Sequence, residues 1–130
     1  MPTSKDVPIL IADDDPVMRQ LLTSMLRGEG HTSVRHVSDG QQAVNLLTAP
    51  GCDIGIAFLD ISMPAFSGLE VMAMSKSALP QCAFIIVSAH SAIANVLAAV
   101  GDGARGFIVK PFTTQKIHDI LNKLDTRTCP

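Results

Sequence analysis

Short apolar runs alternate five times with helical patterns along this chain of 130 residues, and this alternation limits its fold more than any other feature. The runs are expected to form strands at residues 8–12, 32–37, 53–60, 83–88 and 106–110. Helical spacing of apolar residues follows each run, at 16–28, 38–48, 69–77, 91–100 and 113–124. Because the strands are apolar along their whole length, helices must cover both faces of a parallel sheet. The sequence therefore predicts an α/β fold, a (βα)5 sandwich of three layers around a five-stranded parallel sheet.

No linker, repeat or low-complexity segment divides the chain, so we expect one domain over residues 1–130 with its core at about 8–124. The net charge of −2 and the scattered lysines and arginines argue against direct binding of nucleic acid. No apolar run approaches the ~20 residues of a membrane-spanning helix, and the N-terminal segment lacks the apolar core of a signal peptide. These features predict a cytoplasmic protein that does not insert into membranes.

The cysteine and histidine residues lack the spacing of a metal site, and no CxxC pair occurs. The cysteines are also odd in number and far apart in the chain. We therefore expect free thiols at Cys52, Cys82 and Cys129.

Polar side chains stand at the ends of four of the five predicted strands. They are, in chain order, Asp13 to Asp15, Asp60, Ser88 and Lys110. The second strand ends in "VSDG", where Asp39 is expected to cap the following helix. In open parallel sheets, ligands bind beyond the carboxyl ends of the strands. The four sets of polar residues therefore predict one binding site.

The acidic residues of this site need an explanation, because carboxylates ~4 Å apart repel each other by about 4 kcal/mol at an effective dielectric constant of 20. Asp15 precedes Pro16 and is expected to be the N-cap of the first helix. Asp13, Asp14 and Asp60 then remain at the ends of adjoining strands. Mg²⁺, a hard cation that prefers oxygen ligands, offsets their repulsion, so these residues predict a magnesium site.

Ser88 and Lys110 are suited to an anionic ligand beside that metal. A metal ion, an ammonium group and a hydroxyl group together neutralise a phosphoryl group, and this neutralisation is the main requirement of phosphoryl transfer. A carboxylate can itself accept the phosphoryl group and form an aspartyl phosphate. The strand ends therefore predict an Asp-based phosphoryl acceptor.

Four segments in this order resemble the response-regulator receiver domain of two-component signalling, in its stand-alone, chemotaxis-regulator type. They are "ILIADDDPVMR", "FLDISMPAFSGLE", "IIVSAH" and "GARGFIVKPF", and the resemblance covers residues 8 to about 124. It implies a flavodoxin-like fold with the strand order 2-1-3-4-5.

The resemblance also implies a function for the acidic site. Asp60 would accept a phosphoryl group from the phosphohistidine of a histidine kinase or a histidine phosphotransfer protein. Asp13, Asp14, Asp60 and the backbone carbonyl of Ser62 would bind Mg²⁺ (or Mn²⁺). Such a domain is a phosphoacceptor and not an enzyme, since it catalyses only its own phosphoryl transfer and dephosphorylation.

Further roles follow from the same resemblance. Ser88 and Lys110 would bind the phosphoryl group, and Ser88 and Phe107 would form the conformational switch, although Phe107 could equally be an ordinary core residue. Ser62 and His90 would tune the rate of dephosphorylation. The resemblance also implies a cis peptide bond between Lys110 and Pro111 and a turn after Asp60 that Gly68 permits.

In the family that the chain resembles, the output surface comprises the fourth helix, the fifth strand and the fifth helix, which are expected here at 91–100, 106–110 and 113–124. No Asp, Glu, Lys or Arg occurs from Ser77 to Gly101, which suits either an Ala-rich packed helix or a neutral docking face. Phosphorylation is expected to change the surface around Ile93, Val96 and Phe107. A downstream protein of unknown identity would bind there, and a dimer through the same surface is the alternative occupant.

Three other functions fit the sequence less well than that of a phosphoryl acceptor. "DDDPV" also fits the nucleophile motif of haloacid-dehalogenase-type phosphatases, with Asp13 as nucleophile and Asp15 as acid, but only Asp119 and Asp125 follow the lysine as later acids. A pseudo-receiver that is never phosphorylated would not need the full set of acids, hydroxyl and lysine. A flavin or nucleotide binder would need a Gly-rich phosphate loop, which is missing. The sequence does not distinguish a free-standing receiver from a fragment of a longer regulator or hybrid kinase.

Overall fold

The computed structural model describes residues 7–89 and 103–128, and its centre is a five-stranded parallel sheet. The strands are β1 (Ile9–Ala12), β2 (Val34–Val37), β3 (Ile56–Asp60), β4 (Ala83–Ser88) and β5 (Gly106–Val109). Their order is β2-β1-β3-β4-β5, and every neighbouring pair is parallel. The predicted sheet and strand order are confirmed.

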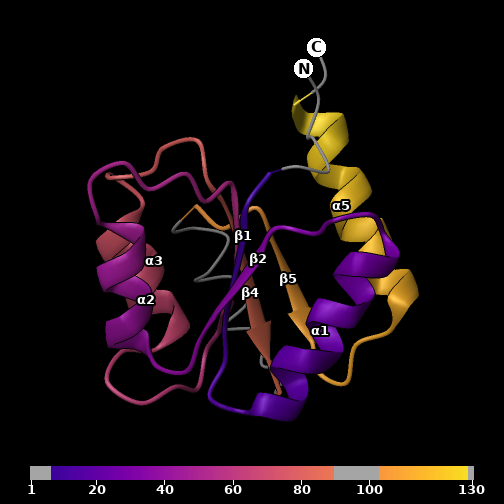
Figure 1. Ribbon diagram of the computed structural model, residues 1–130, viewed down its shortest axis with the longest axis horizontal. Coiled ribbons are helices and arrows are strands. Elements are labelled where there is room, and N and C mark those ends of the chain that lie inside the picture. Colours follow the sequence, from indigo (N-terminus) through magenta and orange to yellow (C-terminus); the bar gives the residue numbers. More distant parts are fainter. Residues whose placement is uncertain (1–6, 90–102, 129–130) are drawn as a thin grey trace.

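Helices cover both faces of this sheet (Figure 1). On one side lie α1 (Pro16–Gly28) and α5 (Thr114–Thr128), and on the other lie α2 (Gly40–Leu47) and α3 (Gly68–Ser75). The three-layer, flavodoxin-like α/β fold is therefore confirmed. The helix expected at residues 91–100 lies outside the described residues.

Two apolar cores form because successive strand residues point to opposite faces of the sheet. Phe58 of β3 packs in the core beneath α1 and α5, whereas its neighbour Leu59 packs in the core beneath α2 and α3. All residues of β1, β3 and β4 are buried. Two-sided burial explains why these strands are apolar along their length, and it fixes the carboxyl end of the sheet as a rigid platform.

Capping residues explain where the helices begin. The side chain of Asp15 accepts a hydrogen bond from the Val17 N–H, and that of Asp39 accepts one from the Gln42 N–H, so both predicted N-caps are confirmed. The start of α3 differs by one residue from the prediction, since Ser67 and Glu70 form a capping box.

The structure also bears on the predicted free thiols, the predicted cis peptide bond and the length of the helices. Cys52 and Cys82 are free thiols, and burial raises the pKa of Cys82 to about 12, so this thiol stays protonated. Cys129 lies outside the described residues. The Lys110–Pro111 peptide bond is cis, as predicted. Within residues 7–89 and 103–128, no helix has the length and apolarity needed to cross a bilayer.

Candidate functional site

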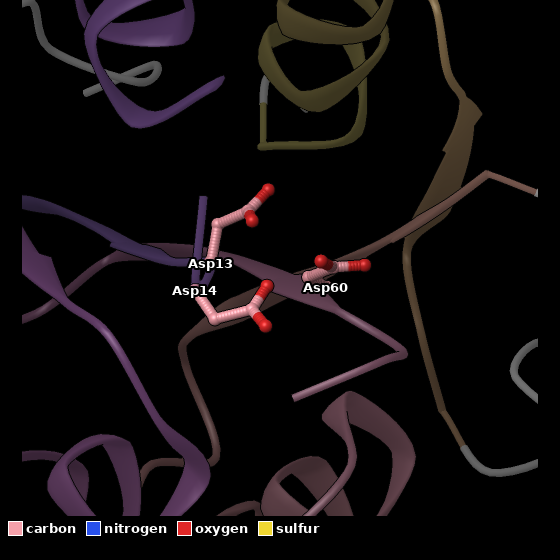
Figure 2. Close-up of side chains that lie close together, drawn as sticks. All are labelled: Asp13, Asp14 and Asp60. Carbon is pink, nitrogen blue, oxygen red and sulfur yellow. The ribbon is translucent and has the colours of Figure 1, made fainter. Parts of the chain in front are cut away.

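The register of the sheet brings three acidic side chains together at its carboxyl end. Ala12 of β1 pairs with Leu59 of β3, so the residues that follow them, Asp13 and Asp60, are neighbours. Asp14 comes next on the chain, and oxygen atoms of all three carboxylates lie within 4.8 Å of one another (Figure 2). Asp13 and Asp60 are buried, whereas Asp14 is exposed. The cluster therefore has a buried floor and one open side.

Lys110 joins two of these carboxylates from the end of β5. Its Nζ lies 2.9 Å from Asp13 Oδ2 and 3.1 Å from Asp60 Oδ2. The backbone N–H of Lys110 donates a hydrogen bond to the Ser88 carbonyl oxygen at 2.7 Å, which fixes the backbone of Lys110 beside the end of β4. One ammonium group thus faces three carboxylates, and the site keeps an excess of negative charge.

The pKa values reflect this excess. Burial, and then the negative charge of Asp13, raise the pKa of Asp60 from 3.8 to about 6, although the charge and hydrogen bond of Lys110 oppose the shift. Burial alone would lower the pKa of Lys110, but its contacts with Asp13 and Asp60 outweigh burial and raise it. Lys110 is therefore a fixed cation, and Asp60 is a carboxylate whose charge is poorly stabilised.

The donor set of this cluster suits a hard divalent cation. All three side chains provide oxygen ligands, these atoms lie close together, and the cluster reaches the surface at Asp14. The raised pKa of Asp60 shows that Lys110 does not offset the combined effect of burial and the negative charge of Asp13. A second cation would therefore be bound favourably here, and Mg²⁺ prefers such ligands.

Asp15 does not belong to the cluster. Its side chain caps α1, and its N–H donates a hydrogen bond to Asp13 Oδ1 at 2.9 Å. The phosphatase alternative requires Asp15 as an acid beside Asp13. Because the Asp15 carboxylate is engaged at the helix N-terminus, the geometry does not favour that alternative.

The remaining predicted site residues surround the acids. Ser62 donates its N–H to Asp60 Oδ1 at 3.4 Å and is exposed. Ser88 ends β4 and is buried, and its strand partner on β5 is Val109. Phe107 lies two residues earlier on β5 with 43% of its surface exposed, so the alternative of an ordinary core residue is wrong. His90 lies outside the described residues, as do Ile93 and Val96.

The loop after Asp60 departs from the expected geometry at Gly68. The residue with positive φ in this loop is Ala65, with φ of 71°. Gly68 is instead the first residue of α3, and a Cβ atom on it would lie 2.5 Å from the Asp60 carbonyl oxygen. Glycine is needed at this position for close approach of two backbone segments rather than for a turn.

Arg19 is a residue of this region that the sequence pattern does not reveal. Its Nη1 donates a hydrogen bond to the Asp13 main-chain carbonyl oxygen at 2.6 Å. Within the helical pattern it is an ordinary polar position, and nothing in the spacing indicates that its side chain folds back over the preceding loop.

Comparison with known proteins identifies the family of the chain. Residues 9–122 match the family model of the response regulator receiver domain, and the chain belongs to this family of phosphorelay receivers. It is 31% identical over 116 residues to the chemotaxis protein CheY of Thermotoga maritima, covering 89% of this chain and 95% of that protein. It is 32% identical over 121 residues to the transcriptional regulatory protein TcrA of Mycobacterium tuberculosis, covering 93% of this chain. The chain spans only about half of TcrA, since the match covers 47% of that protein.

Solved structures of the family have the same fold. A response regulator receiver domain protein from Clostridium thermocellum matches with a TM-score of 0.83 and 26% identity, over 94% of this chain and 96% of that one. A response regulator from Burkholderia pseudomallei with a phosphorylated aspartic acid, calcium ion and citrate matches with a TM-score of 0.78 and 25% identity, over 95% of this chain and 72% of that one. The CheX-CheY-BeF3-Mg+2 complex from Borrelia burgdorferi matches with a TM-score of 0.82 and 28% identity, over 88% of this chain and 86% of the matched chain.

Proposed function

We propose that Asp60 of this chain accepts a phosphoryl group from the phosphohistidine of a histidine kinase or a histidine phosphotransfer protein. The P–N bond breaks as a P–O bond to an Asp60 carboxylate oxygen forms, and the histidine ring takes up a proton as it leaves. The chain acts as a phosphoacceptor in this proposal and catalyses only its own phosphorylation and dephosphorylation. We also propose that the protein is located in the cytoplasm.

The observation that carries this proposal is the ammonium group of Lys110 between the carboxylates of Asp13 and Asp60. A phosphoryl group on Asp60 adds negative charge beside this ammonium group, which is already desolvated and fixed in place. Preorganised cations of this kind stabilise the charge of a transferring phosphoryl group. Burial and the charge of Asp13 disfavour the lone negative charge of Asp60, so this carboxylate gains from a nearby cation.

The proposed magnesium site consists of Asp13, Asp14, Asp60 and the main-chain carbonyl of Ser62. Bound Mg²⁺ supplies charge neutralisation at the phosphoryl oxygens. Ser88 is proposed to donate a hydrogen bond from its hydroxyl group to the phosphoryl group. Ser62 and His90 are proposed to influence how long the aspartyl phosphate survives.

Incubation with a small-molecule acyl phosphate and Mg²⁺ tests the proposal directly. We expect intact mass spectrometry to show one phosphoryl group on the wild-type protein and none on Asp60→Asn, because the amide cannot accept the group. The matched control is Asp53→Asn, which alters an exposed acid just before β3, at the opposite end of that strand. This control is expected to take up phosphate as the wild type does.

Three results would contradict the proposal. Equal uptake by the wild type and Asp60→Asn would exclude Asp60 as the acceptor, and a phosphoryl group mapped to Asp13 would favour the phosphatase alternative. Uptake that is unaffected by chelation of the metal would exclude the proposed role of Mg²⁺.

The output surface provides a further prediction. Phe107 is half-exposed on β5 and lines a cavity of about 240 Å³ with residues of α5, so its ring has room to change position. We expect beryllofluoride with Mg²⁺ to shift the backbone amide signal of Phe107 in NMR spectra far more than the signals of α2. Asp60→Asn should abolish the shift. An unchanged Phe107 signal at saturating beryllofluoride would rule out this surface as the output of phosphorylation, whether its occupant is a downstream protein or a second copy.

A further inference from the structure

Arg19 connects helix α1 to the loop that carries two of the clustered acids. Its N–H donates a hydrogen bond to the Asp15 carbonyl oxygen at 3.1 Å, within the first turn of the helix. Its side chain folds back, and Nη1 donates to the Asp13 carbonyl oxygen at 2.6 Å. A hydrogen bond from a charged donor is shorter and stronger than a neutral one. Arg19 therefore holds the β1–α1 loop at two points, one of them a main-chain atom of the acidic cluster.

Asp13 is held by its N–H and its carboxylate as well as by the bond from Arg19 to its carbonyl oxygen. The Asp13 N–H donates to the Val37 carbonyl oxygen at 3.2 Å, and the Asp13 carboxylate interacts with the Asp15 N–H and with Lys110. The carbonyl belongs to the planar peptide unit that leads into Asp14. Holding this oxygen therefore fixes the direction in which the chain leaves Asp13.

Asp14 depends most on that direction. It is exposed, unlike Asp13 and Asp60, yet its carboxylate oxygen lies within 4.8 Å of theirs (Figure 2). Lys110 contacts the two buried acids, and its bonds do not constrain Asp14. The peptide unit clamped by Arg19 is thus the link by which Asp14 is aimed at the cluster.

We propose that Arg19 is a positioning residue for the metal site, acting through the Asp13 carbonyl to bring the Asp13 and Asp14 carboxylates together with Asp60. This inference rests on the proposed binding of Mg²⁺ by these acids. Residues that hold metal ligands in place from outside the ligand set change metal affinity by 10–100-fold when they are removed.

Charge and position have opposite consequences here, which makes the inference testable. A guanidinium group close to a cation site repels the cation, so its removal should tighten Mg²⁺ binding if only charge matters. If Arg19 aims the ligands, its removal should weaken Mg²⁺ binding despite the loss of a positive charge.

The experiment is a Mg²⁺ titration of isotopically labelled protein, followed by the amide signals of Asp13, Asp14 and Asp60 in NMR spectra. Arg19→Met removes the donor and the charge while it keeps the apolar stem, and we expect its dissociation constant for Mg²⁺ to rise about tenfold or more. Arg19→Lys keeps a charged donor and is expected to stay within about threefold of the wild type. If Arg19→Met does not give the spectrum of a folded protein, Arg19→Gln, which shortens the side chain and removes the charge, replaces it with the same expected loss.

Arg27→Met is the matched control. Arg27 lies two turns further along α1, and both arginines are close enough to His36 to lower its pKa, after the larger effect of burial. Loss of this charge should leave Mg²⁺ affinity unchanged or slightly tighter. An Arg19→Met variant that binds Mg²⁺ as tightly as the wild type, or more tightly, would overturn the inference, as would an equal weakening in Arg27→Met.

Phosphate uptake, measured separately, distinguishes failure of this inference from failure of the proposed function. A wild-type protein that binds Mg²⁺ and takes up no phosphate would refute the function alone, and weakened Mg²⁺ binding by Arg19→Met would still support the positioning role. Normal uptake by the wild type together with the same magnesium dependence in Arg19→Met would refute the positioning role alone.

Discussion

The metal-free Asp60→Asn variant is expected to be more stable than the wild-type protein by about 2 kcal/mol at neutral pH. Asp60 is 4% exposed, and burial and the charge of Asp13 raise its pKa from 3.8 to about 6. A shift of this size corresponds to about 3 kcal/mol of lost stability once the carboxyl group is ionised. The attraction to Lys110 is already included in this shift. Asparagine keeps the shape and removes the charge, but its amide is an imperfect substitute for a protonated carboxyl group, so the expected gain is smaller.

The pH dependence gives this prediction a definite sign. Between pH 3.8 and about 6, folded Asp60 binds a proton that the unfolded chain has released, so the free energy of unfolding falls as pH rises. Above about pH 6, Asp60 is ionised in both the folded and the unfolded state, so its effect on the free energy of unfolding no longer changes with pH. The difference between wild type and Asp60→Asn should therefore be large at neutral pH and disappear towards about pH 4.

Urea unfolding followed by far-UV circular dichroism in the presence of a chelator measures this difference, since the chain has no Trp or Tyr for fluorescence. Asp53→Asn is the control, and we expect its stability to change by less than about 0.5 kcal/mol because it is an exposed surface position. An Asp60→Asn variant less stable than the wild type at neutral pH would mean that attraction to Lys110 outweighs burial and the repulsion from Asp13.

The convergence of the acids was predictable because it follows from the sheet alone. A run of apolar residues that ends in Asp13 and another that ends in Asp60 place both acids at the same edge once the strands are parallel. The N-cap at Asp15 followed from local chemistry, since Pro16 stands next to it. Likewise, the capping box of α3 has a sequence signature, "SGLE", which could have given its first residue correctly.

Contacts between individual atoms of distant residues could not be predicted from residue patterns along the chain. Lys110 was expected to bind a phosphoryl group, but its distances to Asp13 and Asp60 depend on how β5 packs beside β4. The return of the Arg19 side chain to the Asp13 carbonyl has no sequence signal. The role of Gly68 was misjudged because glycine has two uses, positive φ and close approach, and sequence alone does not separate them.

Close approach at Gly68 leads to the second large effect. The first turn of α3 packs directly on the main chain at the end of β3, where the Gly68 N–H donates a hydrogen bond to the Ile61 carbonyl oxygen at 3.2 Å. A Cβ atom at residue 68 would lie 2.5 Å from the Asp60 carbonyl oxygen and 3.0 Å from that of Leu59. Both obstacles are backbone atoms of a buried strand, so they cannot move aside as the end of a side chain can.

Gly68→Ala is therefore expected to destabilise the protein by about 2–3 kcal/mol, even though alanine favours helices over glycine by ~1 kcal/mol. Because the displaced carbonyl belongs to Asp60 itself, phosphate uptake from an acyl phosphate should also slow at temperatures where the variant is fully folded. Gly28→Ala is the matched control, since Gly28 is also a helical residue and its Cβ atom would meet nothing within 4 Å. This control should be as stable as the wild type or more stable by up to about 1 kcal/mol, with normal uptake. Equal stability and equal uptake in Gly68→Ala and Gly28→Ala would show that the α3 N-terminus can move away from β3 without disturbing Asp60, and the rigid platform inferred for this site would then be wrong.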